Sequence, residues 1–134
     1  METVVLDTNV ILRYLTNDVP AQAEKVKKRF LDAAKGKIQF EILPITVVEI
    51  IFQLANWYNL AKDDICRMIL ALFSPDWIII REKEIIFEAI SLYRLKNIDI
   101  VDLLVFVTSK NDHMKILSFD KDFDKLSPKI RLQP

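Results

Sequence analysis

Short apolar runs alternate with longer segments of helical periodicity along this chain. The short runs are rich in β-branched and aromatic residues, so they predict strands over residues 3–6, 40–45, 77–80, 115–118 and 129–132. The segments between them repeat apolar residues every three or four positions and predict helices over residues 10–15, 21–34, 47–58, 64–73, 84–95 and 101–110. A further short turn of helix is expected near Lys121.

Alternation of strands with helices predicts an α/β fold of three layers, in which a mostly parallel sheet is covered by helices on both faces. A length of 134 residues with 51% hydrophobic composition suits one domain with a sizeable core, and no linker or repeat interrupts it. We therefore expect a single domain over residues 1–134.

The overall charge gives no general attraction to nucleic acid or to an anionic membrane, because 19 basic residues balance 19 acidic ones. Any contact with nucleic acid must then be local. The single Cys66 cannot form an internal disulfide, and no secretory signal or apolar run of about 18 residues is present. These features favour a soluble, cytoplasmic protein.

Four acidic residues fall where the predicted strands feed into helices. Asp7 ends the first strand, Glu49 and Asp102 stand in the first turns of two predicted helices, and Asp120 follows the fourth strand. In a parallel sheet these positions share the carboxyl edge, where ligands bind. The topology thus predicts four carboxylates around one crevice.

Helix capping is the alternative explanation for each acid taken singly. Thr46 and Glu49 have the spacing of a capping box, Asp99 and Asp102 have a looser version of it, and Asp120 could be an N-cap. Capping explains acids at separate helix ends but not their collection at one edge. Two carboxylates about 4 Å apart repel by roughly 4 kcal/mol at an effective dielectric of about 20, so such a cluster needs a cation or shared protons.

Oxygen ligands without histidine or cysteine suit Mg²⁺ or Mn²⁺ better than zinc. Such ions support phosphodiester hydrolysis by activating water and stabilising the charge on phosphorus-bound oxygens. The sequence lacks a phosphate-binding glycine loop and a Gly-x-Ser-x-Gly motif, Cys66 has no evident histidine base, and the single His113 fits a surface position.

The segments VVLDTNVILRYLTND, ITVVEI, DIVDLLVF and ILSFDKDFDKL, in this order, resemble the PIN-domain ribonucleases, and in particular the short VapC-like toxins of toxin–antitoxin pairs. The resemblance implies a Mg²⁺- or Mn²⁺-dependent endoribonuclease whose metal ligands are Asp7, Glu49, Asp102 and Asp120. It also implies the strand order 3-2-1-4-5, with Asp7 and Asp120 on neighbouring strands about 5 Å apart, and an antitoxin protein as partner.

Several other residues are candidates for supporting roles. Thr8 or Asn9 could orient Asp7 or a metal-bound water, and Ser118 lies on the same side of its strand as Asp120. Asp99 and Asp122 are either auxiliary ligands or solvated and capping residues. The chain departs from the usual family pattern after Asp102, where small residues often occur; its residues there are Leu103, Leu104, Val105 and Phe106.

Local positive charge for RNA is offered by Lys25, Lys27, Lys28 and Arg29, with Arg13 nearby, although a solvated helix face is the alternative. Trp57 and Tyr58 belong either to a protein interface or to the core. The high apolar fraction is consistent with a homodimer or with a surface covered by the antitoxin.

Two other function classes stay open at this point. A catalytically inactive PIN-like interaction module would not need the complete set of acids. A receiver domain or an aspartate-nucleophile phosphatase fits poorly, because the third strand ends in Arg81 and Glu82, and Asn9 stands where the phosphatase pattern has an acid.

Overall fold

A computed structural model describes all 134 residues of the chain. The chain divides into two compact units, residues 1–82 and residues 83–134, which are described separately. The expectation of a single domain over residues 1–134 stays a prediction.

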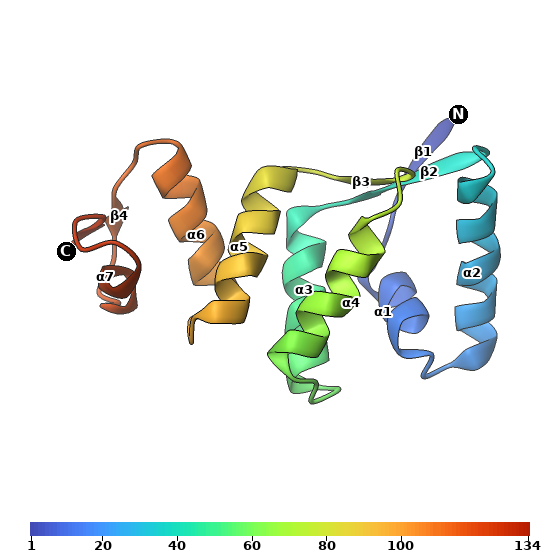
Figure 1. Ribbon diagram of the computed structural model, residues 1–134, viewed down its shortest axis with the longest axis horizontal. Coiled ribbons are helices and arrows are strands. Elements are labelled where there is room, and N and C mark those ends of the chain that lie inside the picture. The colour runs from blue at the N-terminus through green and yellow to red at the C-terminus, as the bar shows by residue number, and fades with distance from the viewer. The chain divides into compact units, whose positions relative to one another are not determined.

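The N-terminal unit is a parallel sheet with four helices (Figure 1). Its elements are β1 (Glu2–Val5), α1 (Thr8–Thr16), α2 (Pro20–Ala34), β2 (Ile38–Ile42), α3 (Pro44–Asn56), α4 (Lys62–Phe73) and β3 (Ile78–Ile80). The strands lie in the order β1-β2-β3, with Val4 opposite Phe40 and Phe40 opposite Ile78. This order agrees with the first half of the predicted sheet.

Local sequence signals explain several of the helix ends. Pro20 and Pro44 stand at the first positions of α2 and α3, where a missing N–H costs nothing and the fixed φ suits a helix. Asn17 ends α1 with a φ of 53°, a left-handed conformation that asparagine adopts more readily than most residues. Gly36 has a φ of 81° in the turn from α2 to β2.

The core of the N-terminal unit joins the sheet to its helices. Buried aliphatic side chains from β2, α1, α3 and α4 form most of it, among them Ile42, Ile11, Ile50, Leu54 and Ile69. An aromatic group extends it, in which the ring of Phe30 lies 4.6 Å from Tyr14, 5.5 Å from Phe40 and 5.1 Å from Trp77. This packing fixes α1, whose first turn follows Asp7.

The C-terminal unit consists of α5 (Lys83–Leu95), α6 (Ile100–Asn111), β4 (Ile116–Leu117), α7 (Asp122–Leu126) and β5 (Arg131–Leu132). Helices α5 and α6 pack together, and β4 pairs in parallel with β5. Leu103, Phe106 and Val107 are buried, whereas Val105 is 40% exposed, so part of the bulky segment after Asp102 fills the core.

The strands form two sheets, of three and two strands, and the pairing of the first with the fourth strand stays a prediction. The predicted boundaries are wrong around Pro44: the strand expected over residues 40–45 is Ile38–Ile42, and the helix expected over residues 47–58 is Pro44–Asn56, because Pro44 begins α3. None of the helices is long and apolar enough to cross a membrane.

Candidate active site

Asp7 follows β1 and occupies the N-cap position of α1. Its side chain makes no capping hydrogen bond, and the residue is exposed. The carboxylate therefore keeps its lone pairs free at the carboxyl end of the strand, so the structure gives no support to the capping interpretation of Asp7.

Glu49 comes from α3 and is held by a residue of α1. The Thr8 hydroxyl donates a hydrogen bond of 2.6 Å to Glu49 Oε2, and Thr8 is buried. The expected capping box of Thr46 and Glu49 is wrong, because α3 begins at Pro44 and Glu49 lies in its second turn. Thr8 thus orients Glu49, whereas the sequence had suggested Asp7 or a metal-bound water as its target.

Asp102 stands in the first turn of α6 among three other carboxylates. Burial, and then the charges of Asp99, Asp120 and Asp122, raise the pKa of Asp102 above its ordinary value. The structure therefore brings together the acids at the start of α6 and after β4. Excess negative charge of this kind favours a bound cation.

The neighbours of Asp102 have local partners of their own. Asp99 caps α6, its side chain accepting a hydrogen bond of 2.7 Å from the Val101 N–H, which confirms the capping alternative. Asp122 forms an ion pair of 2.9 Å with Lys125. Asp99 and Asp122 therefore have structural tasks, and Asp102 is the acid without a hydrogen-bonding partner.

Asp120 lies in the turn between β4 and α7. Its Oδ1 accepts the Asp122 N–H at 2.9 Å, and its own N–H donates to the Ser118 hydroxyl at 2.9 Å. Lys121, not Asp120, is the N-cap residue of α7. Ser118 therefore positions the backbone of Asp120 while leaving the second carboxylate oxygen of Asp120 free for another partner.

Arg131 braces the same turn and was not singled out from the sequence. Its guanidinium binds both carboxylate oxygens of Asp124, at 3.1 and 3.0 Å, and donates to the Ser118 carbonyl at 3.0 Å. The Arg131 side chain is 11% exposed. Nothing in a short strand such as KIRLQ distinguishes this arginine, because its partner lies in α7.

Removing the Asp124 carboxylate should destabilise the protein at neutral pH. The hydrogen bonds from Arg131 hold the pKa of Asp124 below its ordinary value of 3.8, so this stabilisation is present above that value and is lost as the pH falls through the lowered pKa. We expect Asp124→Asn to unfold at lower urea than the wild type at pH 7, with a smaller difference at pH 3. Asp64→Asn, which breaks the exposed pair with Arg67, is the control and should change little. A gap that is constant with pH would contradict this account.

The predicted quartet is divided between the two units, with Asp7 and Glu49 in one and Asp102 and Asp120 in the other. Neither unit by itself arranges three or more acidic, histidine or cysteine side chains to hold a metal ion. The donors nevertheless fit a hard divalent cation, since all are carboxylates, Asp7 is free of a capping bond and Asp102 is crowded by negative charge.

No hydrogen bond or ion pair joins the four predicted acids to Asn9, His113, Trp57 or Tyr58. Asn9 and His113 are exposed, and His113 has a left-handed φ of 56° just after α6. Trp57 is 77% exposed and is therefore not a core residue. Tyr58 donates a hydrogen bond of 2.7 Å to Asp18, which lowers the pKa of that carboxyl.

Comparison with known protein families gives a match for this chain. The family model described as PIN domain matches residues 4–128, which include all four predicted acids. The chain therefore belongs to the PIN domain family. It is also similar to a curated protein named VapC ribonuclease from Aquifex aeolicus (strain VF5), with 25% identity over 123 residues that cover 91% of this chain and 90% of that protein.

Proposed function

We propose that this protein is a metal-dependent endoribonuclease that hydrolyses phosphodiester bonds of RNA. The observation that carries the proposal is the PIN domain match, which spans Asp7, Glu49, Asp102 and Asp120 in a chain that resembles a VapC ribonuclease over 91% of its length. The free carboxylate of Asp7 and the negative charge around Asp102 support it.

In this proposal the four acids would hold Mg²⁺ or Mn²⁺, and the bound ion would supply water activation and charge stabilisation at the phosphate oxygens. The chain's own groups fix those acids. Thr8 orients the carboxylate of Glu49, while Ser118 and Arg131 hold the turn that carries Asp120. Such supporting groups keep ligands in place before substrate arrives.

The resemblance to VapC-like proteins further supports a role as the toxin of a toxin–antitoxin pair, with an antitoxin that blocks the acidic site. We also propose that the protein forms a homodimer. The alternative is an inactive PIN-like module that binds other proteins, and cleavage separates the two.

The test is RNA cleavage by the purified chain with Mg²⁺, Mn²⁺ or EDTA, on structured and unstructured RNA, beside an Asp7→Asn variant. We expect cleavage with either metal, none in EDTA and none by the variant. Cleavage that persists in EDTA or in Asp7→Asn would contradict the proposal, and a complete absence of cleavage would favour the inactive module.

Thr8→Val tests the positioning of Glu49. The substitution removes the 2.6 Å hydrogen bond but nearly preserves the side-chain shape. Loss of such a supporting group typically costs about ten- to a hundredfold in metal affinity or activity. We expect a loss of this size in cleavage and in Mn²⁺ affinity.

The conservative Thr8→Ser should retain most of both, because the donor remains. The matched control is Thr16→Val, in the same helix, whose hydroxyl donates to the Leu12 carbonyl and also interacts with Asp18, which is not a proposed metal ligand. Equal activity of Thr8→Val and Thr16→Val would rule out a positioning role for Thr8.

A further inference from the structure

Arg131 of β5 has nearly all of its guanidinium bound within the C-terminal unit. Its Nε and Nη2 bind the two carboxylate oxygens of Asp124 at 3.1 and 3.0 Å, and its Nη1 donates to the Ser118 carbonyl at 3.0 Å and to Gln133 Oε1 at 2.6 Å. A guanidinium has five N–H groups, so these four bonds leave one of them over. Because the side chain is also only 11% exposed, Arg131 has little capacity left for a phosphate group.

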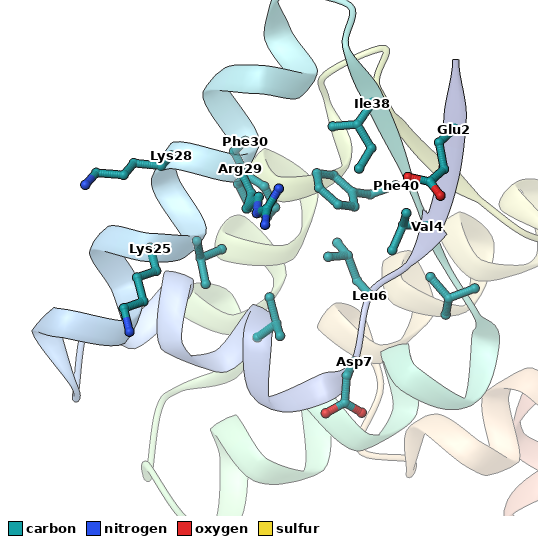
Figure 2. A pocket seen from close by; sticks show the side chains of 13 residues that line it. Glu2, Val4, Leu6, Asp7, Lys25, Lys28, Arg29, Phe30, Ile38 and Phe40 are labelled. Atoms are coloured by element: carbon teal, nitrogen blue, oxygen red, sulfur yellow. The ribbon is translucent and has the colours of Figure 1, made fainter.

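Arg29 of the N-terminal unit shows the opposite case. Its side chain forms no ion pair or hydrogen bond within the chain, and it lines a hollow of that unit whose lining also includes Asp7 (Figure 2). The donors of Arg29 are therefore left for another molecule, whereas those of Arg131 are bound to the chain itself. A place beside the turn that carries Asp120 does not by itself make Arg131 a residue that binds substrate.

The partners of Arg131 lie at the two ends of the turn that carries Asp120. Ser118 follows β4 and precedes Asp120, while Asp124 belongs to α7 beyond it. One planar guanidinium thus joins residues 118 and 124. The strand pairing supports this bridge, because the Ser118 N–H donates to the Leu132 carbonyl at 3.1 Å. The turn cannot open without breaking bonds to β5.

Hydrogen bonds inside this turn fix the carboxylate of Asp120. The Asp120 N–H donates to the Ser118 hydroxyl, and Asp120 Oδ1 accepts the Asp122 N–H, both at 2.9 Å. The Asp122 N–H therefore reports on the place of the carboxylate even when no metal is bound. All of these contacts lie within the C-terminal unit and do not depend on residues 1–82.

We propose that Arg131 is a positioning residue, which holds the Asp120 carboxylate in place before a metal binds by bridging both ends of its turn. The inference rests on the proposed function, which makes Asp120 a metal ligand. Asp124 is then the anchor of the bridge and not a further ligand. A lysine cannot take over this task, because its ammonium group is a point charge without the planar fork of arginine.

The test compares Arg131→Lys, which keeps the positive charge, with Arg131→Gln, which removes it. Mn²⁺ affinity is measured by calorimetry without RNA, and exchange of the Asp122 amide hydrogen is measured by NMR in EDTA. We expect both variants to bind Mn²⁺ about ten- to a hundredfold more weakly than the wild type, and to exchange this hydrogen faster. Asp124→Asn, which leaves Arg131 without its anchor, should change both in the same direction.

Two controls separate positioning from charge and from general stability. Lys129→Gln removes a neighbouring positive charge whose exposed side chain forms no bond within the chain. Glu88→Gln weakens the ion pair with Lys110 that joins α5 to α6. Both should keep wild-type Mn²⁺ affinity and Asp122 exchange, at temperatures where melts show every variant folded. Equal effects of Glu88→Gln and Arg131→Gln, or wild-type values in Arg131→Lys, would overturn the inference.

Binding of a single-stranded RNA oligonucleotide in EDTA, between 50 and 200 mM salt, tests the alternative that Arg131 contacts phosphate. A lost phosphate contact flattens the slope of log affinity against log salt by about 0.7. We expect Arg131→Gln to change the slope no more than Lys129→Gln does. A flattening of about 0.7 in Arg131→Gln that Arg131→Lys restores would overturn the inference.

The wild type tests the proposed function separately, through Mn²⁺ binding and RNA cleavage. Mn²⁺ binding and cleavage that stay at wild-type levels in both Arg131 variants would leave the proposed function standing and overturn the inference. If the wild type binds no Mn²⁺, the proposed function fails and the Asp122 exchange decides: faster exchange in both Arg131 variants supports the bridge, and unchanged exchange overturns it.

Discussion

Asp102→Asn should reduce RNA cleavage at least about a hundredfold while the protein remains folded. The amide nearly matches the carboxyl group in shape, but it removes the charge of a proposed metal ligand. Loss of a direct metal ligand should reduce activity at least as much as loss of a residue that supports a ligand, which costs up to about a hundredfold in activity. Asp102 has no hydrogen bond that the change would break, and losing its charge relieves repulsion with Asp99, Asp120 and Asp122.

The matched control is Asp112→Asn, at the other end of the same helix, where the carboxyl group is exposed. Both variants are assayed at several Mn²⁺ concentrations, with circular dichroism and thermal melts as checks of folding. Full activity of Asp102→Asn at saturating metal would remove Asp102 from the site.

Asp7→Asn should abolish most of the stabilisation that Mn²⁺ gives to the wild type. A ligand at a hundred times its dissociation constant stabilises the native state by about 2.7 kcal/mol, or on the order of 8 °C in melting temperature for a chain of this size. Without metal, the substitution should be neutral or slightly stabilising, because the Asp7 side chain makes no capping hydrogen bond.

Melts of the wild type, Asp7→Asn and Asp7→Ala are recorded with EDTA and with Mn²⁺, beside the exposed Asp76→Asn as control. A cap would instead lose about 0.5 to 2 kcal/mol in Asp7→Ala under both conditions. Equal metal-induced shifts in all four proteins would leave Asp7 without a part in metal binding.

Periodicity was enough to predict the type of every helix and strand, because the longer helices bury an apolar stripe and β1 to β3 are short and rich in β-branched residues. The order β1-β2-β3 and the pairing of β4 with β5 also follow the expected arrangement. The error at residues 43–45 arose because LPIT reads as an apolar continuation of the strand, while proline at a first helical position starts α3.

The earlier start of α3 also changes the role inferred for Glu49. With the helix beginning at Pro44, Glu49 cannot complete a capping box, and its side chain is available to Thr8. The sequence contained the proline that distinguishes these alternatives. It gave Thr8 only as a possible supporting residue of Asp7, since residues 41 positions apart have no contact that a local pattern can reveal.

Most of the supporting contacts of the C-terminal unit could not be predicted from local sequence patterns, for a similar reason. The Asp99 cap of α6 was foreseen, because the residue immediately precedes the helix. The pair of Arg131 with Asp124 depends on β5 passing α7, and only the folded chain shows it. Likewise, the lysines and arginine of α2 were recognised as basic, but only the folded chain shows that Lys25, Lys28 and Arg29 line the same hollow as Asp7.

Mn²⁺ titration by calorimetry of the wild type, Asp7→Asn, Asp102→Asn and the double variant tests most directly whether acids of the two units serve one metal site. If they do, each single substitution should weaken the same Mn²⁺ site at least about tenfold, and the double variant should lose much less than the two effects combined. Wild-type Mn²⁺ affinity in either single variant, or losses that simply add in the double variant, would contradict a shared site.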